Sequence, residues 1–140
     1  MSNSGWALQQ SVYATLAANA GVLALLGAPR IYDDVPPGTA FPYLTFGQST
    51  LRDWSTGSEA GDEHVLTLHV WSRAAGRKET HAIMGALRSA LHDAPLDLDG
   101  HRLVNIRHEL SEARRDPDGD TYHGIVRYRA VTEPSQAQAA

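Results

Sequence analysis

The fold of this chain is decided by the stretch Glu63-His64-Val65-Leu66-Thr67-Leu68-His69-Val70-Trp71-Ser72. Its side chains alternate with a period of two, so one face carries His64, Leu66, Leu68 and Val70, and the other carries Val65, Thr67, His69 and Trp71. β-Branched and aromatic residues favour a pleated surface, and the alternation therefore predicts a strand. Because apolar residues fall on both faces, we expect a central strand and not an edge strand.

A helix is predicted directly after this strand. A short break at residues 73–76 is followed by apolar residues spaced i, i+3, i+4, i+7 and i+8, namely Ile83, Ala86, Leu87, Ala90 and Leu91. This spacing places them on one stripe of an amphipathic helix. A strand that leads into such a helix through a short loop predicts two layers, in which the stripe covers one face of a sheet.

The other elements are indicated by the same two periodicities. Leu8, Val12 and Leu16 mark one side of an N-terminal helix, and Ser4 is a suitable cap for its start. Val22–Leu26 fits one more short helical turn. Further strands are predicted from period-two alternation at residues 41–47, 102–110 and 122–131.

The order of these elements, α-β-β-α-β-β, predicts a single α+β domain over residues 1–132. Because sequential strands without an intervening helix pair antiparallel, we expect a four-stranded, mainly antiparallel sheet with two helices on one face. Residues 133–140 are polar and alanine-rich, and we expect a disordered tail there. A half-covered sheet is a common protein interface, and residues that could lie on its open face are Val65, Trp71, Ile125 and Val131.

The composition excludes several classes of site. The 140-residue chain has no cysteine, which excludes disulfides, thiolate catalysis and cysteine zinc sites. A net charge of −4 gives no indication of broad binding to nucleic acid or to anionic membranes. The longest apolar run, Leu16–Ala28, is interrupted by Asn19 and is shorter than the ~20 residues that a membrane span requires. We therefore expect no membrane partner.

The seven histidines do not form a metal-binding pattern. His64 and His69 point to opposite faces of the strand predicted above, so they cannot chelate one ion from it. His81 and His92 are three turns apart on the predicted helix, about 16 Å by the helical rise. The more economical interpretation is that these histidines are exposed or hydrogen-bonded within the fold.

Residues 116–120 resemble the opening of a calcium loop, but the resemblance ends there. The sixth position is Thr121 instead of glycine, and the twelfth is Arg127 instead of a bidentate glutamate. A tight turn with Asp118-Gly119 at its tip explains the same residues. The sequence also lacks a Gly-x-Ser-x-Gly elbow and a phosphate-binding glycine loop. We therefore expect no catalytic residue, no cofactor and no metal ion, and hence no enzyme.

Two features suggest contacts with a partner. Residues 48–62 join two strands, and this connection is far longer than an ordinary hairpin loop of about 2–5 residues. They form either a ribbon that extends the strands or a flexible arm, and Trp54 within them either packs on the domain or contacts a partner. Exposed cations are the second feature: Arg73 and Arg77 near a helix start, where the dipole disfavours them, and Arg127 and Arg129 on one strand face. The alternative for the first two is a solvated helix end.

The chain resembles the tail-completion, or tail-terminator, proteins of long-tailed bacteriophages and gene transfer agents. Three segments carry the resemblance, in the order and at the spacing of that family. They are Ile31-Tyr32-Asp33 with Val35-Pro36, then Phe41-Pro42-Tyr43-Leu44-Thr45-Phe46-Gly47, then Leu68-His69-Val70-Trp71-Ser72-Arg73 with Gly76 before the helix. Together they cover about Trp6 to Val131.

The resemblance implies a virion protein that assembles into a ring, typically a hexamer, at the head-proximal end of the tail tube. Such a ring ends tube polymerisation and joins the tail to the head connector or stopper, while DNA passes through its lumen without specific binding. The segment 51–62 matches the family's extended connection between its first two strands. The candidate partner-binding residues are Leu51, Arg52, Asp53, Trp54, Glu59, Arg73, Arg77, Arg127 and Arg129.

Two other functions stay open from the sequence. A connector stopper or a tail tube protein would be a neighbouring role in the same assembly. A small-molecule enzyme or binding domain would use histidines on the sheet, for which the candidates are His64, His69 and His108.

Overall fold

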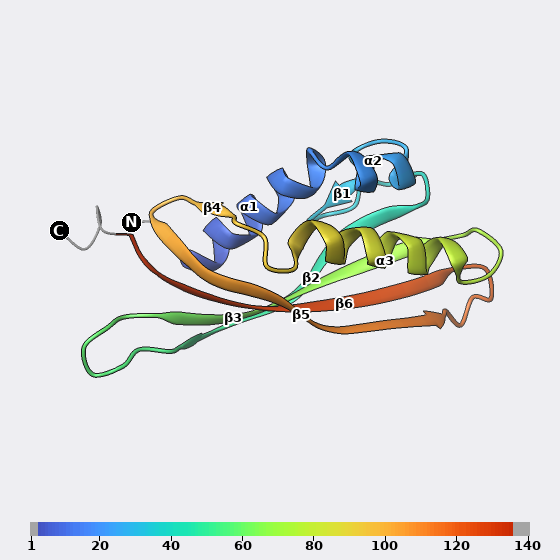
Figure 1. Ribbon diagram of the computed structural model, residues 1–140. Coiled ribbons are helices and arrows are strands. Elements are labelled where there is room, and N and C mark those ends of the chain that lie inside the picture. The colour runs from blue at the N-terminus through green and yellow to red at the C-terminus, as the bar shows by residue number, and fades with distance from the viewer. Residues whose placement is uncertain (1–2, 136–140) are drawn as a thin grey trace.

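Within residues 3–135, which the computed structural model describes, three helices lie on one face of a single twisted sheet (Figure 1). The helices are α1 (Ser4–Ala17), α2 (Ala20–Leu26) and α3 (Lys78–Leu91). The strands are β1 (Ile31–Tyr32), β2 (Tyr43–Asp53), β3 (Asp62–Ser72), β4 (Asp97–Leu98), β5 (His101–Arg115) and β6 (Tyr122–Pro134). They follow the order β1-β2-β3-β6-β5-β4 in the sheet. Only the β1–β2 pair is parallel among these described strands.

The predicted α+β class is confirmed, whereas the prediction of four strands and two helices is wrong in detail. The four long strands β2, β3, β5 and β6 are the ones that alternation indicated. The sheet has six strands because β1 and β4, of two residues each, add to its edges. Two residues are too few to show a period of two. The third helix, α2, is the short turn expected near Val22 and has seven residues.

The core lies between the helices and the covered face of the sheet. The alternation in β3 is confirmed, since His64, Leu66, Leu68 and Val70 are buried while Val65, His69 and Trp71 are only half-buried. The helical stripe is also confirmed, with Ile83, Leu87 and Leu91 fully buried on α3. β3 lies between β2 and β6, so it is the central strand that its two apolar faces indicated.

Asparagine side chains start the first two helices. The Oδ1 atom of Asn3 accepts hydrogen bonds from the backbone N–H groups of Gly5 and Trp6, at 2.8 and 3.1 Å. Ser4, predicted as this cap, is instead the first helical residue, and its hydroxyl donates to Asp62 at 2.8 Å. Asn19 caps α2 in the same way through the N–H of Val22. None of the described helices has the length and hydrophobicity to cross a bilayer.

The long connection at residues 48–62 is a ribbon and not a flexible arm. β2 and β3 stay paired through Leu51↔His64 and Arg52↔Glu63 as far as Asp53↔Asp62. The register shifts once, between Phe46 and Ser49. Beyond this irregularity the paired strands extend away from the body and from the helices (Figure 1).

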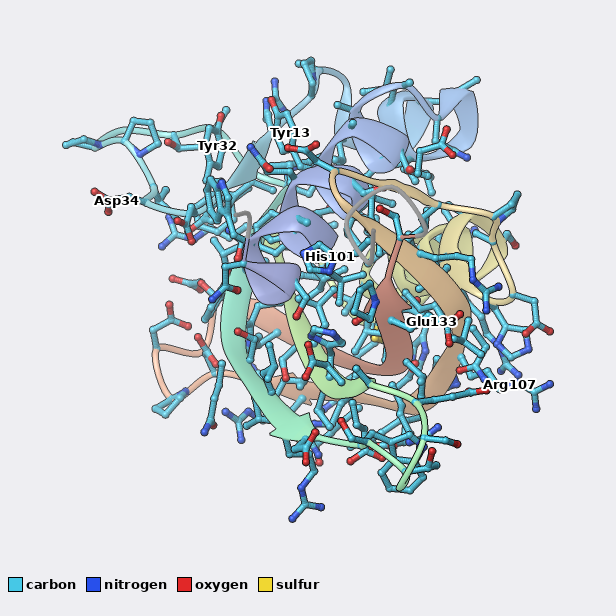
Figure 2. All side chains as sticks on the ribbon, turned by 90° about the vertical axis from the view of Figure 1, so that its left-hand side faces the viewer. Tyr13, Tyr32, Asp34, His101, Arg107 and Glu133 are labelled. Carbon is cyan, nitrogen blue, oxygen red and sulfur yellow. The ribbon has the colours of Figure 1, made fainter. Side chains whose placement is uncertain are left out.

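The boundary predicted for the C-terminal tail is placed too early. β6 includes Glu133 and Pro134, and Glu133 pairs in register with Arg102 of β5 and forms an ion pair with its guanidinium (Figure 2). Sheet pairing therefore continues past Thr132. The rest of the expected tail, residues 136–140, lies outside the described residues.

A close approach between α3 and β6 gives a test of this fold. A Cβ atom on Gly124 would lie 2.9 Å from both Met84 Sδ and Thr80 Cγ2 and 3.2 Å from Val70 Cβ. We expect Gly124→Ala to destabilise the protein by about 1–3 kcal/mol, because the helix must move outward. The measurement is the urea midpoint of unfolding.

The matched control is Gly85→Ala on α3, where no atom lies within 4 Å of the added Cβ. This variant should gain roughly 0.5–1 kcal/mol from reduced backbone entropy. Equal midpoints for the two variants would contradict the tight contact at Gly124.

Candidate assembly surfaces

The sheet face opposite the helices, here called the open face, presents polar and aromatic side chains to solvent. Val65, Trp71 and Ile125, expected on this face, are half-buried, and Val131 is 8% exposed. Arg127 and Arg129 alternate along β6 on the same face, in register with Thr67 and Val65 of β3. The open face is thus a mixed surface and not a bare apolar one.

An ion network joins the ribbon to the open face. The Nε of Arg129 donates to Glu63 Oε2 at 2.6 Å, and Arg52 Nη1 lies 3.7 Å from Glu63 Oε1. The Glu63 side chain is 12% exposed and the Arg52 side chain 75% exposed. The guanidinium of Arg129 also lies over the ring of Trp54, 5.1 Å from its centroid. One carboxylate therefore holds cations from β2 and β6 together.

Trp54 both packs on the domain and remains exposed, so neither of the two alternatives left open by the sequence holds alone. One face of its indole covers Arg129, yet 53% of the residue remains exposed. Its backbone N–H donates to the carbonyl of Gly61 at 2.8 Å, which fixes the strand end. Trp54 is consequently positioned by the fold and still available to a partner.

The tip of the ribbon is held by short-range hydrogen bonds. Asp53 Oδ1 accepts from the hydroxyl and the N–H of Ser55, at 2.6 and 3.2 Å. The N–H of Thr56 donates to the carbonyl of Glu59, and Glu59 is exposed. Leu51, 46% exposed, lines a hollow with Trp6 at the start of α1. The five ribbon candidates thus lie on one projecting element.

An aromatic and imidazole stack occupies the other end of the open face. The rings of Trp71 and His123 are nearly parallel at 3.9 Å, and His69 Nδ1 lies 2.6 Å from His123 Nε2. The indole N–H of Trp71 donates to Thr45 at 3.0 Å. Asp116 Oδ1 is 3.7 Å from His123 Nδ1. Sequence reasoning missed this stack, although His69 and Trp71 on one strand face were a signal for it.

Burial lowers the pKa of both histidines in the stack. Desolvation is the main cause for each. The nearby Arg114 further lowers the pKa of His69, and His69 further lowers that of His123, while Asp116 opposes the latter shift. The pair is therefore neutral in the folded protein at neutral pH, with one ring donating to the other.

Arg73 and Arg77 lie beside this stack, far along the sheet from the ribbon. The Nε of Arg73 donates to Thr121 Oγ1 at 3.2 Å, and its guanidinium lies 4.3 Å from the Phe41 centroid. Arg77 lies 5.6 Å from the ring of Tyr122. Both residues are exposed but positioned by these neighbours. The nine candidates therefore divide into a ribbon group with Arg127 and Arg129 and a second group at the opposite sheet end.

The other histidines and aspartates considered as metal ligands form hydrogen bonds within the fold. His64 and His69 do point to opposite faces, and His64 Nε2 lies 2.9 Å from Thr132 Oγ1 on the covered side. Asp118 caps a tight turn, accepting from the N–H groups of Asp120 and Thr121, and hydrogen bonds from Thr121 lower its pKa. Within residues 3–135 no three histidine or carboxylate side chains converge on a metal site.

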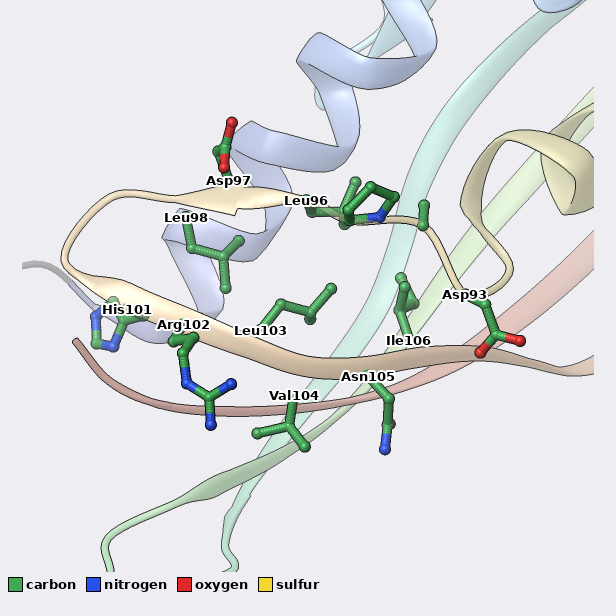
Figure 3. Close-up of a pocket in the computed structure, with 12 residues that line it drawn as sticks. Asp93, Leu96, Asp97, Leu98, His101, Arg102, Leu103, Val104, Asn105 and Ile106 are labelled. Atoms are coloured by element: carbon green, nitrogen blue, oxygen red, sulfur yellow. The ribbon is translucent and has the colours of Figure 1, made fainter. Parts of the chain in front are cut away.

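A hollow of about 460 Å³ lies between the β4 segment and β5 (Figure 3). Leu98 and Leu103 point into the space between the two segments, while Arg102 and Val104 point away from it. Leu96 is buried against the core, with Leu98 and Leu103 packed beside it. The leucines pack the β4 segment onto the sheet, and the polar side chains of the lining, among them Asp97, His101 and Asn105, stand around them.

Comparison with known proteins finds similar proteins in a bacteriophage and in a gene transfer agent particle. A family model described as "Tail completion protein gp17" matches residues 10–133. A curated relative, tail completion protein gp17 of Bacillus phage SPP1, is 30% identical over 89 residues, which cover 64% of this chain and 66% of that protein. Among solved structures, a chain from the virion of a native gene transfer agent particle is 34% identical, with a TM-score of 0.87. That similarity covers 95% of this chain and 99% of the other.

The stack predicts a pH dependence of stability. The pKa values of His64, His69 and His123 lie below their usual value of 6.5 in the folded state, so the unfolded chain takes up protons first as the pH falls. This contribution to stability is complete above about pH 6.5 and declines from there down to the folded-state pKa values. We expect a falling urea midpoint between about pH 7 and about pH 5.

His123→Gln should show a weaker decline, because it removes one histidine and the coupling to the other. His81→Gln, which changes an exposed histidine of α3 outside the stack, is the control. An identical pH profile for His123→Gln and the wild type would contradict the role of the stack.

Proposed function

The chain belongs to the tail completion protein gp17 family and is thus a structural tail component of a phage-like virion, and we propose that it forms a closed ring at the head-proximal end of the tail tube. The ring ends polymerisation of the tube and joins the tail to the head connector or stopper. DNA passes through its lumen. We propose a ring of six copies, the size that is typical of the family that the sequence resembles.

The observation that carries this proposal is the whole-length similarity to a chain of a gene transfer agent virion. A structural role in a particle requires surfaces for several partners at once and no catalytic pocket. The chain has such surfaces in its projecting ribbon and in an open sheet face. In a ring, each copy meets its neighbours through two different surfaces, and closure of the ring keeps assembly from continuing as a filament.

The two groups of candidate residues suit two kinds of contact. The ribbon carries Leu51, Arg52, Asp53, Trp54 and Glu59 beyond the helices, where they can reach the tail tube protein or a neighbouring copy. Arg73 and Arg77 lie at the other end of the sheet, where they can face the head connector. Contacts at both ends match a protein placed between two other assemblies.

The charge of the chain is compatible with DNA passing without being held. Affinity for duplex DNA depends on the number of phosphates that lysine and arginine neutralise. The protein has 12 such residues against 16 acidic ones. Glu63, Asp93 and Glu133 already pair with four of the arginines, Arg52, Arg107, Arg102 and Arg129.

Deletion of this protein from its producing particle tests the proposal directly. We expect tails of uncontrolled length or tails that do not join heads, because no ring ends the tube. Electron microscopy of the particles measures both. Normal length and normal joining would refute the ring at the tube end, and location of the chain in many stacked rings or within the connector would instead identify a tube protein or a stopper.

Trp54→Ala tests the ribbon. Because Trp54 is half exposed and contacts mainly Arg129, we expect unfolding stability to change by less than about 1 kcal/mol. The yield of joined particles should fall about tenfold or more, as for an exposed aromatic anchor. Plaque or transduction titre and particle counts measure the yield.

Leu110→Ala is the comparison, since Leu110 is 40% exposed and lies opposite Arg127 on the open face, away from the ribbon. Its yield should fall less than that of Trp54→Ala, because the ribbon is the proposed anchor. Equal yields for the Trp54 and Leu110 variants would remove the ribbon from the contact surfaces.

A further inference from the structure

A groove of about 400 Å³ runs between α1 and the β1 edge of the sheet. Its walls are Trp6, Gln9, Gln10, Tyr13, Ile31, Asp33 and Phe46. Trp6 and Tyr13 are 53% and 43% exposed, so two aromatic rings border the groove with much of their surface uncovered. The fold does not use these rings to fill its own core.

Two aspartates stand at the same edge. Asp33 and Asp34 directly follow β1 and are exposed, and neither forms an ion pair within residues 3–135. The nearest cation in sequence, Arg30, donates to the carbonyl of Leu26 at 2.7 Å. Figure 2 places Asp34 on the same side of the molecule as Tyr32. We call Trp6, Tyr13, Asp33 and Asp34 the α1–β1 flank.

Exposed aromatic faces next to unpaired carboxylates are suited to a guanidinium group. An arginine stacks on an aromatic ring and simultaneously donates to a carboxylate through its planar fork. Gln9 and Gln10 add amide groups at the rim of the groove. The chemistry of the α1–β1 flank therefore fits an arginine-bearing protein surface.

The opposite edge of the same protein carries such a surface. His108 of β5 donates its backbone N–H to His92 Nδ1 at 3.0 Å and lies near Arg88 of α3, and we call Arg88, His92, Arg107 and His108 the β5–α3 flank. Arg107 is 66% exposed, and its carboxylate neighbour is Asp93, 3.4 Å away and also 55% exposed. Burial lowers the pKa of His108, and the neighbouring Arg88 and His92 lower it further. The acidic residues Glu109 and Glu112 lie farther along β5, beyond Arg107.

The two flanks lie at opposite edges of the sheet. β1 ends one side of the strand order, and β5 with the two-residue β4 ends the other. Figure 2 shows Tyr32 and Asp34 on one side of the molecule and Arg107 on the other. One copy therefore cannot join its own flanks, whereas neighbouring copies in a ring can.

We infer that the α1–β1 flank of one copy receives the β5–α3 flank of the next copy, with Arg107 entering the groove between Trp6 and Tyr13 and pairing with Asp33. This inference rests on the proposed ring and specifies its subunit interface. The occupant of the groove is a second copy of this chain, because the acidic flank repels nucleic acid and the complementary cations are present on the same protein.

Charge exchange tests this pairing in assembled particles. Asp33→Arg and Arg107→Glu each place like charges at the interface, and each should lower the yield of joined particles about tenfold. The combination of both substitutions restores opposite charges and should recover the yield to within about threefold of wild type. Asp97→Arg and Lys78→Glu are controls with the same charge changes at exposed sites outside both flanks, and they should keep the wild-type yield.

Chemical cross-linking supplies a measurement that does not depend on yield. The chain has no native cysteine, so Asp33→Cys with Arg107→Cys creates the only two thiols of each copy. A short bismaleimide applied to purified particles should give a ladder of covalent oligomers up to the ring size. The pair Asp97→Cys with Lys78→Cys should give monomers.

The outcomes separate the interface from the proposed function. Single variants with wild-type yield, a double variant no better than either single, or no ladder in particles that contain the ring would overturn this interface and leave the ring intact. Electron microscopy that places the wild-type chain outside any ring would overturn the proposed function and the interface with it.

Discussion

The contact of α3 with the centre of the sheet is the constraint on which the rest of the structure depends. Gly124 lets Thr80 and Met84 approach β6 more closely than any side chain would permit. This fixes the depth of α3, whose buried stripe then covers β3 and β6 with Ile83 and Leu87. α1 and α2 pack against the remaining width of the same face. All the helices are thereby confined to one side, and the other side is left to solvent.

That one-sided arrangement explains where the exposed features occur. The covered face holds most of the fully buried apolar residues of the long strands, such as Leu66, Leu68 and Val126, whereas the open face mixes arginines, histidines and Trp71 with a few half-buried apolar residues. The β2–β3 ribbon extends past the end of α1, where no helix covers either of its faces (Figure 1). An isolated two-stranded ribbon is marginally stable in water. Here Glu63 stabilises it by holding Arg52 of the same ribbon and Arg129 of β6.

The parts of the fold that the sequence predicted are those fixed by long periodic patterns. The stretch 63–72 indicated a central strand correctly, and the stripe from Ile83 to Leu91 indicated α3. The two-residue strands could not be predicted, because their pairing is decided by tertiary contacts such as the bond from Leu44 N–H to the carbonyl of Arg30. The sequence left a ribbon and a flexible arm as alternatives for residues 48–62, because pairing between two strands produces little pattern in the local sequence of either. The His69–His123 pair joins residues 54 positions apart, and only the register of β3 with β6 brings them together.

Order in the exposed elements matters for an assembly that must close accurately. A flexible arm would lose conformational entropy on binding, whereas a ribbon tied by Glu63 and by the bond from Trp54 to Gly61 has already lost it in the free subunit. The same reasoning applies to the α1–β1 flank, where Trp6 and Tyr13 are fixed along one helix. Surfaces that are ordered before contact also set the angle between neighbouring copies. Because a ring closes only at one such angle, rigidity of these elements is a geometric requirement as well as an energetic advantage.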